Sequence, residues 1–154
     1  MKTVSFSRLL CAGFLTTSLL LVGCSSNTTS DQATTNGKCS DEQKTSVTDH
    51  ISSQITAFEQ KNWDEAYGFA SGSFQESVSK SAFQEIILRQ YSFIVNNSGY
   101  SFGSCSAGED GILQNLTINS GSQSYELIYN LILEDGSLGI DAAKILSASE
   151  NVAT

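Results

Sequence analysis

Few side chains in this sequence could transfer a proton near neutral pH, and His50 is the only histidine. It follows Asp49, but neighbours in a helix point about 100° apart, so these two side chains do not face each other. His50 also flanks an apolar helical stripe that includes Val47. We therefore expect a histidine at a helix edge, and keep it as a candidate for a catalytic base.

Asp141 is the other candidate for acid–base chemistry. It lies in the last predicted strand, an odd number of positions away from Leu138 and from Ile140. If those two residues face the core, Asp141 faces solvent, because successive side chains of a strand point to opposite faces. A β-bulge would instead reverse the register and bring Asp141 into a pocket. We expect the solvent-facing arrangement and therefore predict no catalytic residue.

The remaining polar residues argue against several kinds of site. Two sulfurs and one distant histidine are too few ligands for a metal, and the acids of Glu109-Asp110 and Glu134-Asp135 lack the spacing of a calcium loop. No glycine-rich phosphate loop is present in the sequence. A net charge of −8 argues against a nucleic-acid or anionic-lipid binder held by charge. We expect no metal, no cofactor and no nucleic-acid partner.

The most specific motif lies near the N-terminus. Lys2 and Arg8 precede an uncharged stretch over residues 9–22, which has the length of a signal peptide and is short for a membrane span. It ends in Leu21-Val22-Gly23-Cys24, which resembles the lipobox of bacterial lipoproteins. The resemblance implies cleavage before Cys24 and attachment of a diacylglyceryl group to its thiol. The alternative is an ordinary signal peptide, or a short anchor, with a chance cysteine.

On this interpretation the chain is a lipid-anchored protein of the bacterial cell envelope, outside the cytoplasm, and in the outer membrane where the host has one. Residues 1–23 are the signal peptide, 24–38 the lipidated cysteine and a flexible tether, 39–148 the folded domain and 149–154 a C-terminal tail. Loss of Lys2 and Arg8 changes the net charge from −8 to −10. Acyl chains such as palmitate, rather than charge, would therefore hold the protein at the membrane.

The cysteines also predict a disulfide. Cys11 leaves with the signal peptide and Cys24 carries the lipid, so Cys39 and Cys105 remain as a pair in an oxidising compartment. We expect them to form a structural disulfide bond.

Apolar periodicity predicts three helices before residue 99. The first begins at the capping box Ser40-Asp41-Glu42-Gln43 and continues with apolar residues three or four positions apart. Asn62 is expected to cap a second helix over 63–70, and Ser79 or Ser81 to begin a third. We expect residues 74–78 to form a loop or a short extended segment.

From Tyr100 onward the apolar residues alternate, which predicts strands. Turn signals at 108–111, 119–122 and 134–137 separate these strands. The sequence therefore predicts an α+β domain, with three N-terminal helices packed on one face of a curved antiparallel sheet of about four strands.

Several short motifs resemble the nuclear transport factor 2-like superfamily, which has a cystatin-like cone, and within it an uncharacterised bacterial branch. They are the junction Ala57-Phe58 with residues 62–71, the pair Phe83 and Tyr91, and the turn 134–137 followed by Ile140. The chain departs from the family pattern at Gly72, Leu138 and Gly139. The resemblance implies a cone-shaped pocket between helices and sheet, in which the enzymes of the superfamily place an Asp, often with a His or Tyr.

Aromatic side chains are the candidates for lining such a pocket, namely Trp63, Tyr91, Phe102, Tyr125 and Tyr129. Their hydroxyls would orient a ligand. The alternative is ordinary core packing, with the tyrosine tips reaching the rim.

We therefore expect a membrane-anchored, non-catalytic binding or interaction module. Its partner would be a small apolar ligand in the cone, or a second protein across the open sheet face, which includes a homodimer. The alternative is a small-molecule pocket enzyme of the isomerase, cyclase or dehydratase type, with Asp141 or His50 as its acid or base. A carboxylate or imidazole at the bottom of a closed apolar cavity would favour the enzyme, and a filled cone the interaction module.

Overall fold

The computed structural model describes residues 37–150, which contain five strands and five helices. The order along the chain is β1 (Gly37–Lys38), α1 (Asp41–Glu59), α2 (Trp63–Gly68), α3 (Gly72–Ser77), α4 (Lys80–Gln90), α5 (Ser92–Val95), β2 (Gly99–Gly108), β3 (Gly111–Ser120), β4 (Gln123–Glu134) and β5 (Ser137–Glu150). The predicted signal peptide, Cys24 and most of the predicted tether lie outside the described residues.

The five strands form one antiparallel sheet in the order β1-β2-β3-β4-β5, so strands that are adjacent in the sheet also follow one another in the sequence. The turn between β4 and β5 is a two-residue hairpin. Its residues Asp135 and Gly136 have φ values of 51° and 78°. Positive φ at both positions is the conformation that tight hairpins require, and it explains the Asp-Gly pair predicted as a turn.

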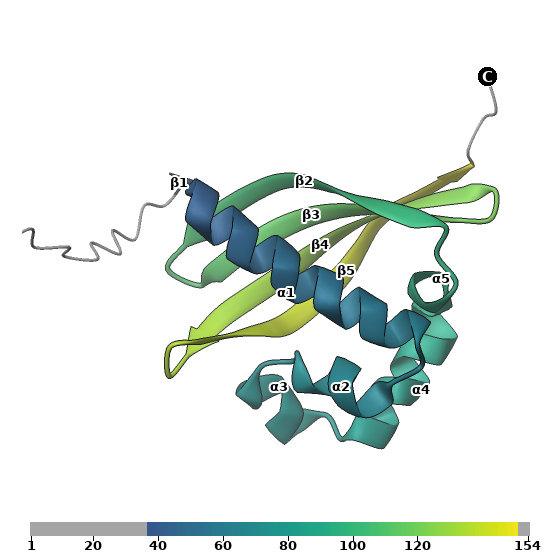
Figure 1. The fold of residues 1–154 in the computed structure, drawn as a ribbon, viewed down its shortest axis with the longest axis horizontal. Helices are drawn as coiled ribbons and strands as arrows, with labels where there is room; N and C mark the ends of the chain where they lie inside the picture. The colour runs from purple at the N-terminus through teal and green to yellow at the C-terminus, as the bar shows by residue number, and fades with distance from the viewer. Residues whose placement is uncertain (1–36, 151–154) are drawn as a thin grey trace, which may run out of the picture. The chain divides into compact units, whose positions relative to one another are not determined.

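Helix α1 crosses one face of this sheet; in the view of Figure 1, α2, α3 and α4 lie below it and α5 lies beside its C-terminal end. The predicted capping box is present, since the Ser40 hydroxyl accepts from the Gln43 amide and the Gln43 side chain accepts from the Ser40 amide. The apolar stripe of α1 is almost fully buried, as are the inward-facing residues of β3 and β4. The hydrophobic core lies between these two surfaces.

The expectation of three N-terminal helices on a sheet of about four strands is wrong. A short strand, β1, precedes the helices and gives the sheet a fifth member. The predicted loop at residues 74–78 lies largely within helix α3, and the predicted third helix is divided into α4 and α5.

Contacts from distant parts of the chain cause these differences. Strand β1 pairs with β2 through Gly37 and Lys38, directly beside the disulfide at Cys39. Helix α3 has no buried residue, and therefore no apolar periodicity that sequence reasoning could detect. Helix α4 ends at Gln90 and is followed by Tyr91, whose hydroxyl donates a hydrogen bond to the Ala143 carbonyl of β5 at 2.8 Å.

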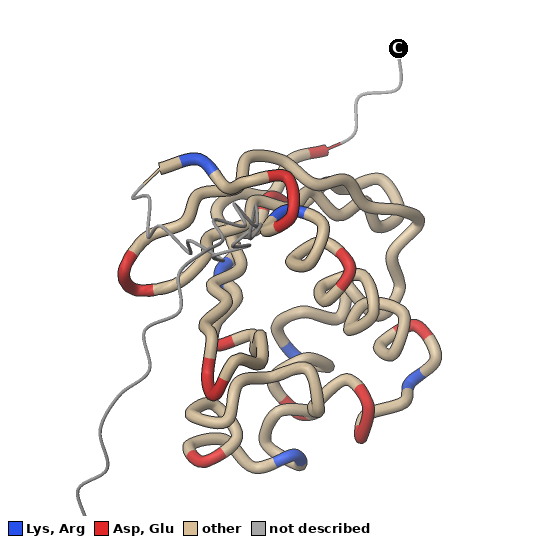
Figure 2. The backbone as a smooth tube through the Cα atoms, turned by 60° about the vertical axis from the view of Figure 1, so that its left-hand side comes forward, with Lys and Arg blue, Asp and Glu red and all other residues tan. Residues whose placement is uncertain are grey.

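Acidic residues outnumber basic residues along the described chain, and many lie in turns or in the first turn of a helix (Figure 2). Acidic side chains in the first turn of a helix interact favourably with its dipole. Within residues 37–150, no helix is both long and apolar enough to cross a membrane.

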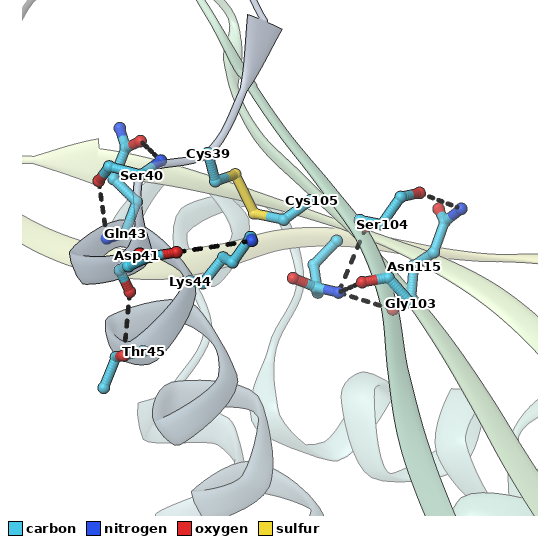
Figure 3. Close-up of a disulfide and its surroundings, with 11 residues drawn as sticks. Cys39, Ser40, Asp41, Gln43, Lys44, Thr45, Gly103, Ser104, Cys105 and Asn115 are labelled. Atoms are coloured by element: carbon cyan, nitrogen blue, oxygen red, sulfur yellow. Dashed lines mark hydrogen bonds and ion pairs between the residues drawn. A yellow bond between two sulfur atoms is a disulfide. The ribbon is translucent and has the colours of Figure 1, made fainter.

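The predicted disulfide is confirmed: Cys39 and Cys105 are bonded, with 5.5 Å between their Cα atoms (Figure 3). The bond joins the residue before the α1 cap to β2, next to a bulge between Phe102 and Cys105. The buried Gln114 side chain donates to the carbonyls of Gly103 and Ser104 at this bulge, at 3.2 and 3.3 Å. The start of α1 is thereby fixed to the sheet.

We predict that Cys39→Ala/Cys105→Ala lowers the free energy of unfolding by about 2–4 kcal/mol, because the bond closes a long loop in the unfolded chain. The sequence separation of the two cysteines is 66. Guanidinium denaturation followed by the fluorescence of Trp63, the single tryptophan, measures this. Reduced wild-type protein is the control, since it keeps both side chains and lacks only the bond. Equal stability of the oxidised, reduced and substituted proteins would contradict the prediction.

Candidate functional site

A cavity of about 200 Å³ lies between the helices and the C-terminal part of the sheet. Its walls come from α1, α3, α4, α5, β4 and β5, together with Ala70 and Tyr91 in the connecting segments. Most of its lining is apolar, consisting of Phe58, Ala70, Phe74, Phe83, Ile86, Ile87, Ile94, Ile140, Ala142 and Ala143. This volume exceeds the roughly 150 Å³ of an engineered apolar cavity that binds benzene.

Tyr129, on β4, supplies the most deeply buried polar group of the lining, with 1% of its surface exposed. Its hydroxyl has no hydrogen-bond partner among the described residues. Every fully buried side-chain polar atom of these residues does have a partner, so this hydroxyl is not fully buried. It therefore borders open space, which the cavity provides. Burial, with a smaller contribution from Tyr91, raises the pKa of Tyr129 above its usual value of 10.0. The phenol stays protonated and can donate to a ligand.

Gln54 is the second buried polar residue of the lining, at 3% exposure. It occupies the apolar stripe of α1, and its Nε2 donates to the Ala66 carbonyl at 3.1 Å. Its Oε1 has no partner among residues 37–150, so it remains an acceptor. Gln54 was not predicted as a site residue. The pattern that indicates it is a glutamine within an otherwise apolar helical stripe.

Asp141 also lines the cavity, so the expectation that it faces solvent is wrong. In the pairing of β4 with β5, Asn130 lies opposite Ala142 and Leu131 lies opposite Ile140, which leaves Asp141 as the extra residue of a bulge. A bulge turns the extra side chain away from the regular alternation. The alternative considered from the sequence, a bulge that brings Asp141 to a pocket, is the one observed.

Two serine hydroxyls hold the Asp141 side chain. Ser71 Oγ and Ser73 Oγ donate to Oδ1 at 3.0 and 3.1 Å, and Oδ2 has no partner among the described residues. Asp141 is half-buried, whereas Tyr129 and Gln54 are buried, so solvent reaches Asp141 more readily than the other two. Neither serine was singled out from the sequence, because each is about 70 residues away from its partner.

The segment that carries these serines is fixed to β5 at very short range. Ser71 N–H donates to the Ile140 carbonyl and Ile140 N–H to the Phe69 carbonyl, both at 2.9 Å. A Cβ atom at Gly139 would lie 2.6 Å from Ser71 Cα. Glycine is therefore required at position 139.

Glu134, at the end of β4, fixes the start of α3. Its carboxylate accepts from the Gly72 amide at 2.5 Å and from the Ser73 amide at 3.1 Å. The side chain and the amide of Ser73, together with the Gly72 amide, lower the pKa of Glu134 below its usual value of 4.5. This contact matters for the cavity because α3 also carries Phe74, one of the lining residues.

The other residues predicted for the site are dispersed. Of the five aromatic candidates, Tyr91 and Tyr129 line the cavity, whereas Trp63, Phe102 and Tyr125 do not. Tyr125 stacks on Phe93 with 3.8 Å between the ring centroids. Trp63 packs against Phe58, and Phe102 against Tyr100. These three are part of the packed aromatic structure around the core.

His50 does not line the cavity, and its Nε2 lies 2.9 Å from the Phe69 carbonyl. Its ring also makes an edge contact with Phe69. Within residues 37–150, no group of three or more His, Cys, Asp or Glu is placed to hold a metal ion. The cavity can thus offer a ligand an apolar enclosure, a phenol donor, an amide acceptor and one carboxyl group.

We predict that Glu134→Gln destabilises the protein at neutral pH and has no effect in acid. The lowered pKa means that the carboxylate stabilises the folded state above about pH 4.5, and that this contribution disappears as the pH falls through the pKa of the folded state. Urea denaturation at a series of pH values from 7 to 2 measures the difference, which should shrink as the pH falls below 4.5. Glu109→Gln, the same change at an exposed turn, is the control and should match wild type throughout. A difference that stays constant over this range would contradict this interpretation.

Comparison with known proteins gives a family. The model of the family described as a domain of unknown function (DUF4864) matches residues 40–153. No curated protein and no solved structure matches the chain. Since the matched residues include nearly all of the described domain, the chain belongs to the DUF4864 family.

Proposed function

We propose that this protein is a lipid-anchored binding protein outside the cytoplasm, whose domain takes up a small, largely apolar molecule in the cavity. The observation that carries the proposal is an apolar cavity of about 200 Å³ with an unpartnered tyrosine hydroxyl on its wall. The wall of this partly open cavity is mostly apolar, so an apolar ligand would remove apolar surface from water. The same ligand would give the Tyr129 hydroxyl a partner.

The lining favours a compact, mainly apolar ligand. Aromatic and branched aliphatic side chains surround the cavity, while its polar groups are few and lie apart along the walls. This is the usual composition of small-molecule sites, where a few polar groups fix the orientation of a ligand held by apolar contact.

The sequence supports the anchored location. The segment Leu21–Cys24 has the lipobox pattern after a basic and an apolar region. The disulfide between Cys39 and Cys105 fits an oxidising compartment, where such bonds persist. A lipid at Cys24 would leave a short polar segment before the folded domain, enough to hold the domain near the membrane surface.

A pocket enzyme is the second candidate, and the position of Asp141 favours it. Asp141 and Tyr129 share one cavity, as a general base and a hydrogen-bond donor would. However, Asp141 is half-buried rather than enclosed, and its Oδ1 already accepts from two hydroxyls. The buried polar residues of the lining are Tyr129 and Gln54, which suit ligand orientation better than proton transfer. We therefore favour binding.

We predict that filling the cavity weakens ligand binding. Ala143→Leu adds three carbons to a residue of the lining, and should weaken the binding of 2-phenylethanol about tenfold or more. The free energy of unfolding should change by less than about 1 kcal/mol, because the added atoms enter open space. Isothermal titration calorimetry and urea denaturation measure the two quantities.

Ala148→Leu is the matched control, since it makes the same change on the same strand at an exposed residue outside the lining. It should bind 2-phenylethanol as wild type does. Absence of binding to wild type, or equal binding to the Ala143→Leu protein, would contradict the proposed site.

The anchor is tested separately by metabolic labelling with an alkyne analogue of palmitate in a bacterial host. We predict that wild type incorporates the label and that Cys24→Ala loses it, because the thiol at position 24 is the proposed acceptor. Cys11→Ala is the control and should keep the label, since Cys11 lies within the predicted signal peptide. Equal labelling of wild type and Cys24→Ala would contradict the anchor and leave the cavity unaffected.

A further inference from the structure

Asp141 gives the cavity a charge preference. It carries the only carboxyl group of the lining, and no Lys, Arg or His is among the lining residues. The ion pairs of the described residues are Lys44–Asp41, Lys80–Asp64 and Arg89–Glu85, none of which involves Asp141. Its Oδ1 accepts from Ser71 and Ser73, and these donors are neutral hydroxyls. A half-buried carboxylate beside an apolar wall thus has no countercharge in the described part of the chain.

The nearest basic residue along β5 points elsewhere. Lys144 follows Ala143, which lines the cavity, and Lys144 is exposed. It pairs with Ile128, whereas Ala143 pairs with Tyr129. Because successive side chains of a strand alternate, Lys144 and Ile128 lie on the opposite face of the sheet from Tyr129.

Unfilled acceptors outnumber unfilled donors in the lining. Asp141 Oδ2 and Gln54 Oε1 have no partner among residues 37–150, and the Tyr129 hydroxyl is the one comparable donor. A protonated amine has several N–H donors and a positive charge, so it satisfies acceptors and supplies the countercharge. Aromatic rings also form part of the lining, and cations bind favourably to ring faces.

We infer that the ligand of this cavity is an organic cation: a protonated amine carried by a compact apolar or aromatic body. The ammonium group binds at the Asp141 carboxylate, and the apolar body occupies the space between α4, β4 and β5. This inference rests on the proposed binding function and specifies its ligand class. The acidity of the chain, with a net charge of −8, draws cations toward the protein.

The test uses three probes of similar size that differ in charge: 2-phenylethylamine as the cation, 2-phenylethanol as the neutral analogue and phenylacetate as the anion. Titration of the purified wild-type protein at low ionic strength should give about tenfold tighter binding of the amine than of the alcohol. Phenylacetate should bind more weakly than the alcohol. If none of the three binds, the proposed function itself fails. If the alcohol or the acid binds as tightly as the amine, binding stands and the cation preference is overturned.

Asp141→Asn tests whether the Asp141 carboxylate causes the preference for the cationic amine. The asparagine Oδ1 can still accept from both serines, so the variant should fold, which urea denaturation followed by Trp63 fluorescence checks. The affinity for the amine should fall about tenfold, to that of the alcohol. Asp135→Asn, the same change in the exposed β4–β5 turn, should leave both affinities unchanged. Retention of the amine preference in Asp141→Asn, or an equal loss in Asp135→Asn, would overturn the assignment.

Discussion

Two backbone hydrogen bonds join the segment between α2 and α3 to strand β5, from Ser71 N–H to the Ile140 carbonyl and from Ile140 N–H to the Phe69 carbonyl. They extend the edge of the sheet by a short parallel bridge at Ala70. The approach is close enough that Gly139 has no room for a side chain. This contact determines where the chain turns from α2 into α3. It therefore fixes the side of the cavity that faces β5.

The bulge at Asp141 follows from the same contact. The residue before it is bound to Phe69 and Ser71, and the residue after it returns to the register of β4. The extra residue is thereby turned toward the α3 segment, where two serine hydroxyls receive its carboxylate. One local irregularity in β5 thus places a carboxyl group on the wall of an otherwise apolar cavity. The proposed selectivity for cations is a consequence of this backbone arrangement.

The sequence predicted best those features whose causes are local. The capping box at Ser40 and the Asn62 cap are short-range contacts, and both are present. The disulfide was predictable because only two cysteines remained unassigned. Helix α3 was missed, and the bulge was considered only as the less favoured alternative, because Glu134 and Asp141 bind partners 62 and 70 residues away. The cavity could be expected only from resemblance, since a void between side chains leaves no pattern in sequence.

The open apolar cavity beside Tyr129 can be examined in a crystal structure of the protein under xenon pressure. Xenon enters apolar cavities of this kind without needing polar contacts. We expect xenon density between α4, β4 and β5, next to Phe83 and Ile140. A structure without xenon, in which Phe74 and Tyr91 have moved inward to fill the space, would contradict it.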